Sequence, residues 1–118
     1  MNTPDSIIIV NRFFEALEIL RSEHIIRGLK TFAHRYGIND RNIWLQRREP
    51  ARNIFQPAWL EYLVRDYALS AEWLLLGEGP VFDQERKRAF DEARAAEKKA
   101  KHRKKTATAL FEEPEAVL

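Results

Sequence analysis

The chain has 118 residues and a mass of 13.9 kDa, the size of one domain. Its 20 lysines and arginines against 18 aspartates and glutamates leave a formal charge of only +2. Leu, Ile, Val and Phe make up 27 of the first 82 residues but only 5 of the last 36. We therefore expect a compact domain of about 80 residues, followed by a charged extension.

The residue inventory excludes several kinds of chemistry. The absence of cysteine excludes disulfides, thiolate metal sites and thiol nucleophiles. His24, His34 and His102 lack metal-ligand spacing, and the four glycines form no phosphate loop, so we expect no enzyme, metal or cofactor. No apolar run is longer than the four residues 7–10, which is too short for a membrane span or a signal peptide. This predicts a cytoplasmic protein without a membrane partner.

The first expected helix covers residues 11–22, where apolar residues recur at helical spacing and Asn11 can cap. An N-terminal arm at 1–10 precedes it. The isoleucines at 7–9 either extend this helix or form a short strand or arm that packs on a second copy of the protein. Burial of these isoleucines in the chain's own core is the favoured interpretation.

Two short helices with a three-residue turn between them follow. The first covers residues 29–36 and ends at Gly37, a residue suited to a left-handed helix terminus. The second covers 39–48, with Asn39 as its cap and Asp40 in its first turn.

Two further helices complete the predicted domain. Pro57 suits the first turn of one, and Ser70 can cap the other, which Gly77 ends. No segment shows the sustained two-residue alternation of a half-buried strand. The predicted fold class is therefore all-α, with five helices over residues 11–82.

Residues 29–48 have the outline of a helix-turn-helix, whose second helix can enter the DNA major groove. The stretch resembles the phage-repressor-type (XRE-like, lambda-repressor-like) helix-turn-helix family, which has a small residue in the second helix, glycine at the turn and apolar residues around both. The matching positions are Phe32, Ala33, Tyr36, Gly37, Ile38 and Ile43. Gln46 stands where the pattern has an apolar residue, so either the third helix is rotated and Leu45 takes the core role, or the fit is looser.

A second segment, SAEWLLLGEGP, resembles the helix that closes many domains of this type, and the two matches cover roughly residues 10–82. The segments FAHRYGIN, FQPAWLEYLVRDY and SAEWLLLGEG together also resemble those of small bacterial helix-turn-helix proteins. The resemblance implies a five-helix lambda-repressor-like domain that binds double-stranded DNA.

Charge is concentrated around the predicted recognition helix. Residues 27–52 contain seven basic and two acidic residues, a local charge of +5, whereas residues 1–82 contain ten of each. A solvated surface produces such clusters too, but the coincidence with the recognition helix favours DNA.

The resemblance places five residues on the groove-facing side of the third helix: Asn39, Asp40, Arg41, Trp44 and Arg48. Arg41 is the candidate for a bidentate contact to guanine, and Asn42, if rotated inward, for reading adenine. Asp40 fits a capping role better than a cytosine contact. Trp44 either touches a thymine methyl group or the sugar–phosphate wall, or packs on the neighbouring helix. The expected phosphate contacts are Lys30, Thr31, Arg47 and Arg52.

The extension over residues 83–118 is charged and favours helix, with ten basic and four acidic residues in 84–105. Alanines recur there at spacings of four and three, at Ala89, Ala93, Ala96 and Ala100. They form either a seam for pairing or an accidental pattern, and the basic run at 98–105 is either a DNA-backbone arm or a solubilising tail. The acidic end FEEPEAVL is predicted to be disordered.

The sequence thus predicts a sequence-specific DNA-binding protein, a transcriptional regulator of repressor type that reads the major groove with helix 39–48. A homodimer is expected, because one short helix reads too few bases. Two alternatives use the same fold. One is a protein-interaction module that holds a partner through Trp44, Leu45 and the N-terminal isoleucines. The other is an antitoxin, which adds a protein partner to DNA binding.

Overall fold

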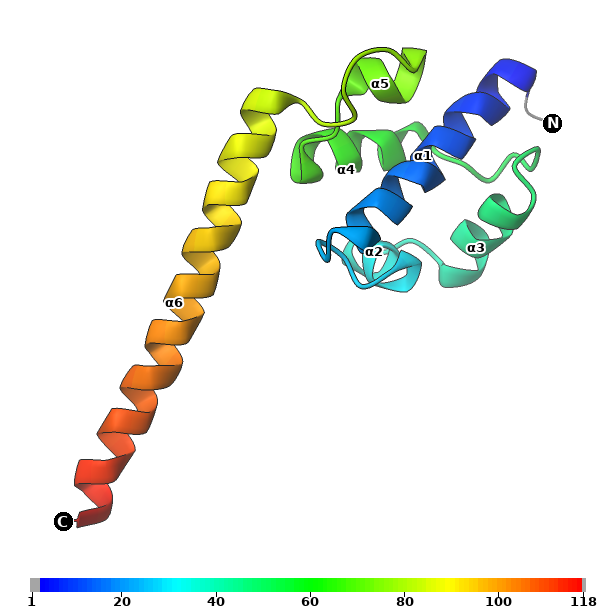
Figure 1. The fold of residues 1–118 in the computed structure, drawn as a ribbon. Helices are drawn as coiled ribbons and strands as arrows, with labels where there is room; N and C mark the ends of the chain where they lie inside the picture. The colour runs from blue at the N-terminus through cyan, green and yellow to red at the C-terminus, as the bar shows by residue number, and fades with distance from the viewer. Residues whose placement is uncertain (1–2, 118) are drawn as a thin grey trace. The chain divides into compact units, whose positions relative to one another are not determined.

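A computed structural model describes the backbone of residues 3–117 and the side chains of residues 3–101. It contains six α-helices and, over the described residues, a single isolated β-bridge in place of strands (Figure 1). The chain divides into two compact units, Met1–Asp83 and Gln84–Leu118. The fold class is therefore all-α, as predicted.

The first helix begins earlier than the sequence analysis predicts. α1 (Pro4–Ser22) has proline in its first turn, and Thr3 Oγ1 accepts a hydrogen bond from the backbone N–H of Ser6 at 3.2 Å. This capping chemistry outweighs the poor helix propensity of the isoleucine run. Residues 4–10 are therefore helical, which confirms the alternative that the isoleucines extend the helix and contradicts the N-terminal arm. Asn11 lies inside the helix instead of capping it.

α2 (Leu29–Arg35) ends in a Schellman motif. Gly37 adopts a φ of +66°, and its N–H lies 3.4 Å from the carbonyl oxygen of His34. The N–H of Ile38 donates to the carbonyl oxygen of Ala33 at 2.9 Å. These two bonds satisfy carbonyls that the helix end would otherwise leave unpaired.

α3 (Asp40–Arg48) begins directly after this turn. Asn39 is its cap, as predicted, because the Asn39 Oδ1 accepts a hydrogen bond from the N–H of Asn42 at 3.1 Å. Ala33 and Ile43 are fully buried, so a small side chain and a β-branched one lie in the core of the α2–α3 pair.

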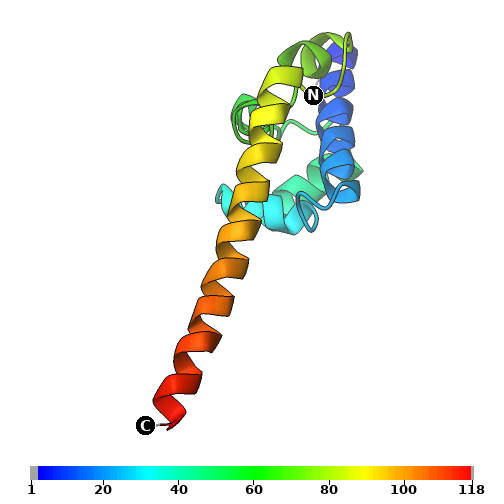
Figure 2. The same ribbon diagram turned by 60° about the vertical axis from the view of Figure 1, so that its left-hand side comes forward.

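The remaining helices of the first unit are α4 (Pro57–Tyr67) and α5 (Ala71–Leu76). Ser70 caps α5 by accepting a hydrogen bond from the N–H of Trp73 at 3.2 Å, and Gly77 ends it with a φ of +71°, both as predicted. Figures 1 and 2 both show α5 beside the N-terminal half of α1, and α2 beside its C-terminal end.

An aromatic cluster forms the centre of the core. Phe13 on α1 is fully buried, and its ring centroid lies 5.8 Å from that of Phe32 on α2 and 5.8 Å from that of Trp59 on α4. Phe55, in the loop before α4, stands 5.2 Å from Phe13. Phe13 thus contacts both α2 and α4. Full burial of one side chain of this kind stabilises the folded state by about 1.5–3 kcal/mol.

The second unit is the single helix α6 (Gln84–Val117). An ion pair between Lys87 and Asp91 at 3.1 Å links successive turns. The four alanines of the suggested pairing seam are exposed on this unit. The helix continues through the acidic end, but that end's side chains, like those of the basic run beyond Lys101, lie outside the described residues. No helix in the described part is long and apolar enough to cross a bilayer.

Gly37→Ala is expected to lower the free energy of unfolding by about 1 kcal/mol. The added methyl group meets no atom within 4 Å, so the cost is backbone strain at positive φ alone. Gly28→Ala is the matched control, because its backbone is extended (φ 168°) and its surroundings are equally open. Urea unfolding measures both variants, and equal stabilities would contradict the left-handed turn.

Candidate nucleic-acid interface

α3 has a buried face and an exposed face. Ile43 and Gln46 are 1% and 0% exposed. Arg41, Trp44 and Arg48 are exposed, and their spacing of three and four residues places them together on the opposite side of the helix. Three of the predicted base-reading residues therefore share one solvent-facing surface.

Gln46 occupies the inward position where the family pattern has an apolar residue. Its Oε1 accepts hydrogen bonds from the backbone N–H groups of Ile54 at 2.9 Å and Phe55 at 2.8 Å, and its Nε2 donates to the carbonyl oxygen of Pro50 at 3.0 Å. Leu45 is only half-buried and does not replace it. The alternative of a rotated helix with Leu45 in the core role is therefore wrong, and the looser fit to the pattern stays a prediction.

These bonds hold the loop between α3 and α4 against the inner face of α3. A buried amide is tolerated only when its donors and acceptors are paired, and here both ends of the side chain are. The same loop carries Phe55 into the aromatic core. Gln46 thus couples the orientation of α3 to the packing of the whole first unit.

Trp44 is 53% exposed, which excludes a core role and leaves it on the outward surface of α3. The guanidinium carbon of Arg48 lies 5.6 Å from the centre of its ring, a cation–π distance. The contact orders two of the predicted base-reading side chains relative to each other.

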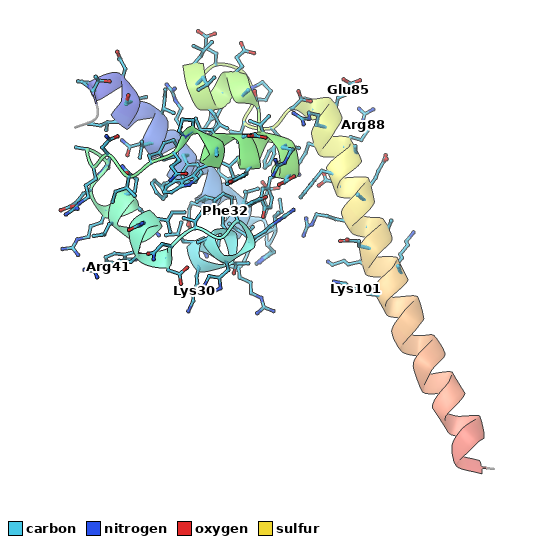
Figure 3. All side chains as sticks on the ribbon, turned by 180° about the vertical axis from the view of Figure 1, so that it is seen from behind. Lys30, Phe32, Arg41, Glu85, Arg88 and Lys101 are labelled. Atoms are coloured by element: carbon cyan, nitrogen blue, oxygen red, sulfur yellow. The ribbon has the colours of Figure 1, made fainter. Side chains whose placement is uncertain are left out.

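A cleft of about 410 Å³ lies between α3 and the start of α2. Its apolar lining residues are Leu29, Ile43 and Trp44, and its cationic ones are Lys30, Arg41 and Arg47. Figure 3 shows Lys30 and Arg41 projecting from the same edge of the first unit. Half of the predicted site residues thus meet at one depression, namely Asp40, Arg41 and Trp44 of the base-reading set and Lys30 and Arg47 of the phosphate-contacting set. The other half do not line it, namely Asn39, Asn42, Arg48, Thr31 and Arg52. We refer to it as the α2–α3 cleft.

Asp40 is the single acidic residue of the α2–α3 cleft, and it does not cap α3. Its Oδ2 lies 3.1 Å from Nε2 of His34. Its Oδ1 is covered and has no hydrogen-bond partner among the described residues. Asn39 makes the capping bond instead, and it uses only the backbone N–H of Asn42. Asn42 is exposed, so its side-chain amide can contact a ligand.

The four predicted phosphate-contacting residues differ in surroundings. Lys30 and Thr31 are exposed at the start of α2. Arg47 lines the α2–α3 cleft and also a second pocket that contains Arg21. Arg52 is hydrogen-bonded to Glu49, whose carboxyl pKa is lowered by this contact, so an acid already balances its charge.

Further contacts outside the predicted site attach α2 to α4. The ring of Tyr36 stacks on that of Tyr62 with centroids 4.0 Å apart, and its hydroxyl donates to Asp66 Oδ2 at 2.6 Å. The guanidinium of Arg65 and then the Tyr36 hydroxyl lower the pKa of the Asp66 carboxyl. The sequence identified Tyr36 only as a position that matches the helix-turn-helix pattern, because these partners, Tyr62 and Asp66, lie more than twenty residues away.

Comparisons of the chain with protein families, curated proteins and solved structures find no match. Within the described residues, no group of three or more histidine, aspartate or glutamate side chains is arranged to hold a metal ion. The exposed aromatic and cationic surface of α3 is therefore the feature that points to a function.

Gln46→Leu is expected to lower the free energy of unfolding by about 2–4 kcal/mol, because it leaves two N–H groups and a carbonyl without their buried partner. Gln56→Leu, at an exposed position before α4, is the matched control and should change little. Urea unfolding gives the difference. Native-state hydrogen exchange should also show faster exchange at Ile54 and Phe55, and unchanged exchange there would refute the assigned role.

Proposed function

We propose that the protein is a sequence-specific DNA-binding protein of the phage-repressor helix-turn-helix type, and a transcriptional regulator. α3 would enter the major groove. The observation that carries this proposal is the exposed face of Arg41, Trp44 and Arg48 on α3. The other face of the helix is fixed by a fully buried glutamine whose amide oxygen accepts two hydrogen bonds and whose amide nitrogen donates one.

Charge supports duplex DNA as the ligand. Among the described residues, Lys30, Arg41 and Arg47 form no ion pair with a carboxylate, although the first unit as a whole is nearly neutral. Unpaired cations are therefore concentrated at the α2–α3 cleft, where phosphates would neutralise them. Arg41 has the planar, two-pronged geometry that reads guanine, and Lys30 at the edge suits a phosphate.

Selection of the full-length protein on random duplexes should recover a motif containing guanine. Arg41→Ala should lose the preference at that base pair, with a loss of affinity of about ten-fold or more. Lys30→Ala should weaken all duplexes alike and reduce the slope of log affinity against log salt by about 1.

Arg88→Ala is the matched control, because it removes the same charge from an exposed position on α6. It should keep the motif. Failure of the wild-type protein to enrich any motif would overturn sequence-specific binding and support the protein-interaction alternative. Enrichment of a motif that also needs a second protein would instead support the antitoxin alternative.

A homodimer is part of the proposal, because one short helix discriminates too few base pairs. Besides Trp44, the large exposed apolar residues of the described chain are Ile8 on α1 and Leu75 and Leu76 on α5. Arg12, one turn after Ile8, donates to the carbonyl oxygen of Leu75 at 3.0 Å, which places these side chains at one end of the α1–α5 pair. This apolar end is the proposed contact with a second copy.

Leu76→Asp should convert a dimer into a monomer and steeply lower affinity for a two-half-site duplex, because a charge would replace an apolar contact. Sedimentation equilibrium measures the mass. Gln56→Asp, which adds the same charge at an exposed polar position, should leave the dimer intact. A wild-type protein that stays monomeric both free and on DNA would contradict this assignment.

A further inference from the structure

The α2–α3 cleft combines two properties that one ligand must satisfy together. Leu29, Ile43 and Trp44 make its lining largely apolar. Lys30 from α2 and Arg41 and Arg47 from α3 outnumber its one acid, Asp40, so the charge around the lining is positive. A purely anionic ligand would leave the apolar lining unused. A purely apolar ligand would leave three cations unpaired.

Duplex DNA presents a matching combination at one edge of its bases. The 5-methyl group of thymine is the apolar group in the major groove, and phosphates line both sides of that groove. We infer that the α2–α3 cleft binds a thymine methyl group, next to the base pair that Arg41 contacts. This inference rests on the proposed function and specifies which bases the site selects.

Trp44 is the residue that makes this contact. Its ring is exposed and lines the α2–α3 cleft, and Arg48 stands 5.6 Å from the ring centre. This cation–π contact restricts the ring before DNA binds, so less side-chain freedom is lost when a methyl group packs against it. Ile43, which is 1% exposed, fixes the inner end of the α2–α3 cleft on the rigid part of α3.

The alternative occupant is an acidic peptide with an apolar side chain, which would use the same lining. DNA is favoured because cations from two helices flank the apolar lining, and because Arg41 and Asn42 offer guanidinium and amide groups that read bases. A peptide needs no such base-reading groups.

The experiment replaces thymine by deoxyuridine, one position at a time, in the duplex that selection recovers. This removes the methyl group alone and keeps every hydrogen bond of the base pair. Fluorescence anisotropy with the full-length protein should show a loss of affinity of about four- to five-fold at one thymine adjacent to the guanine, the value of one buried methyl-sized group. The other thymines should change affinity less than two-fold.

Trp44→Ala should abolish this difference, so that thymine and deoxyuridine duplexes bind the variant equally. Arg41→Ala is the matched control, because it should weaken binding while keeping the preference for the methyl group. A preference that persists in Trp44→Ala would overturn the role of Trp44. The scan with wild-type protein tests the α2–α3 cleft itself even if the tryptophan variant does not fold.

Different results would contradict the DNA-binding function and the contact with the thymine methyl group. If no duplex is enriched, both the DNA-binding function and the methyl contact are wrong. If a duplex is enriched but deoxyuridine is neutral at every position, sequence-specific binding stands and the methyl contact is overturned. If duplexes do not bind but an acidic, leucine-containing peptide competes with a probe at Trp44, the α2–α3 cleft is a protein-binding site.

Discussion

The hydrogen bonds of Gln46 are the constraint on which the exposed surface of α3 depends. α2 and α3 have seven and nine residues, too few for either helix to be stable alone in water. Their orientation must therefore come from tertiary contacts. Gln46 supplies those contacts from inside α3, because its amide bonds to Pro50, Ile54 and Phe55 fix the following loop to the helix. The positions of the exposed residues of α3 therefore depend on the buried Gln46.

The local signals in the sequence located most of the first unit correctly. Two residues cap the start of a helix, Asn39 and Ser70, and two glycines end one, Gly37 and Gly77. Each acts through contacts within a few residues, so its role can be predicted from the sequence. The predicted start of the first helix at residue 11 was wrong, and the alternative that the isoleucines extend this helix is confirmed, because Thr3 caps α1 and Pro4 begins it. At that position the cap and the proline determine the start of the helix more strongly than the β-branched side chains oppose it.

The sequence did not predict the contacts between residues that no periodic pattern connects. Gln46 was recognised only as a departure from the pattern, since its partners lie four to nine residues away in a loop without periodicity. Tyr36 and Asp66 are thirty residues apart. The α2–α3 cleft likewise needs Leu29 and Trp44 to come together from two helices. Composition and spacing predict which side chains face outward, but not which of them form a cavity.

The charge distribution shows why a nearly neutral chain can still present a surface suited to DNA. Several cations are paired locally, as Arg52 is with Glu49 and Arg65 is with Glu61 and Asp66. The α2–α3 cleft itself is lined by one acid, Asp40, which lies 3.1 Å from His34. Arg47 also lines the neighbouring pocket with Glu18, whose carboxyl pKa is lowered mainly by Arg21 and to a smaller extent by Arg47. Local pairing thus matters more for the site than the net charge of +2.

The central claim is that α3 and the start of α2 together form the DNA-reading surface. The most direct test is an NMR titration of the full-length, isotopically labelled protein with its selected duplex. The account predicts that the largest amide shift changes fall within residues 28–31 and 39–48, with the indole N–H of Trp44 among them. Changes confined to the apolar end of α1 and α5, or to α6 alone, would contradict it.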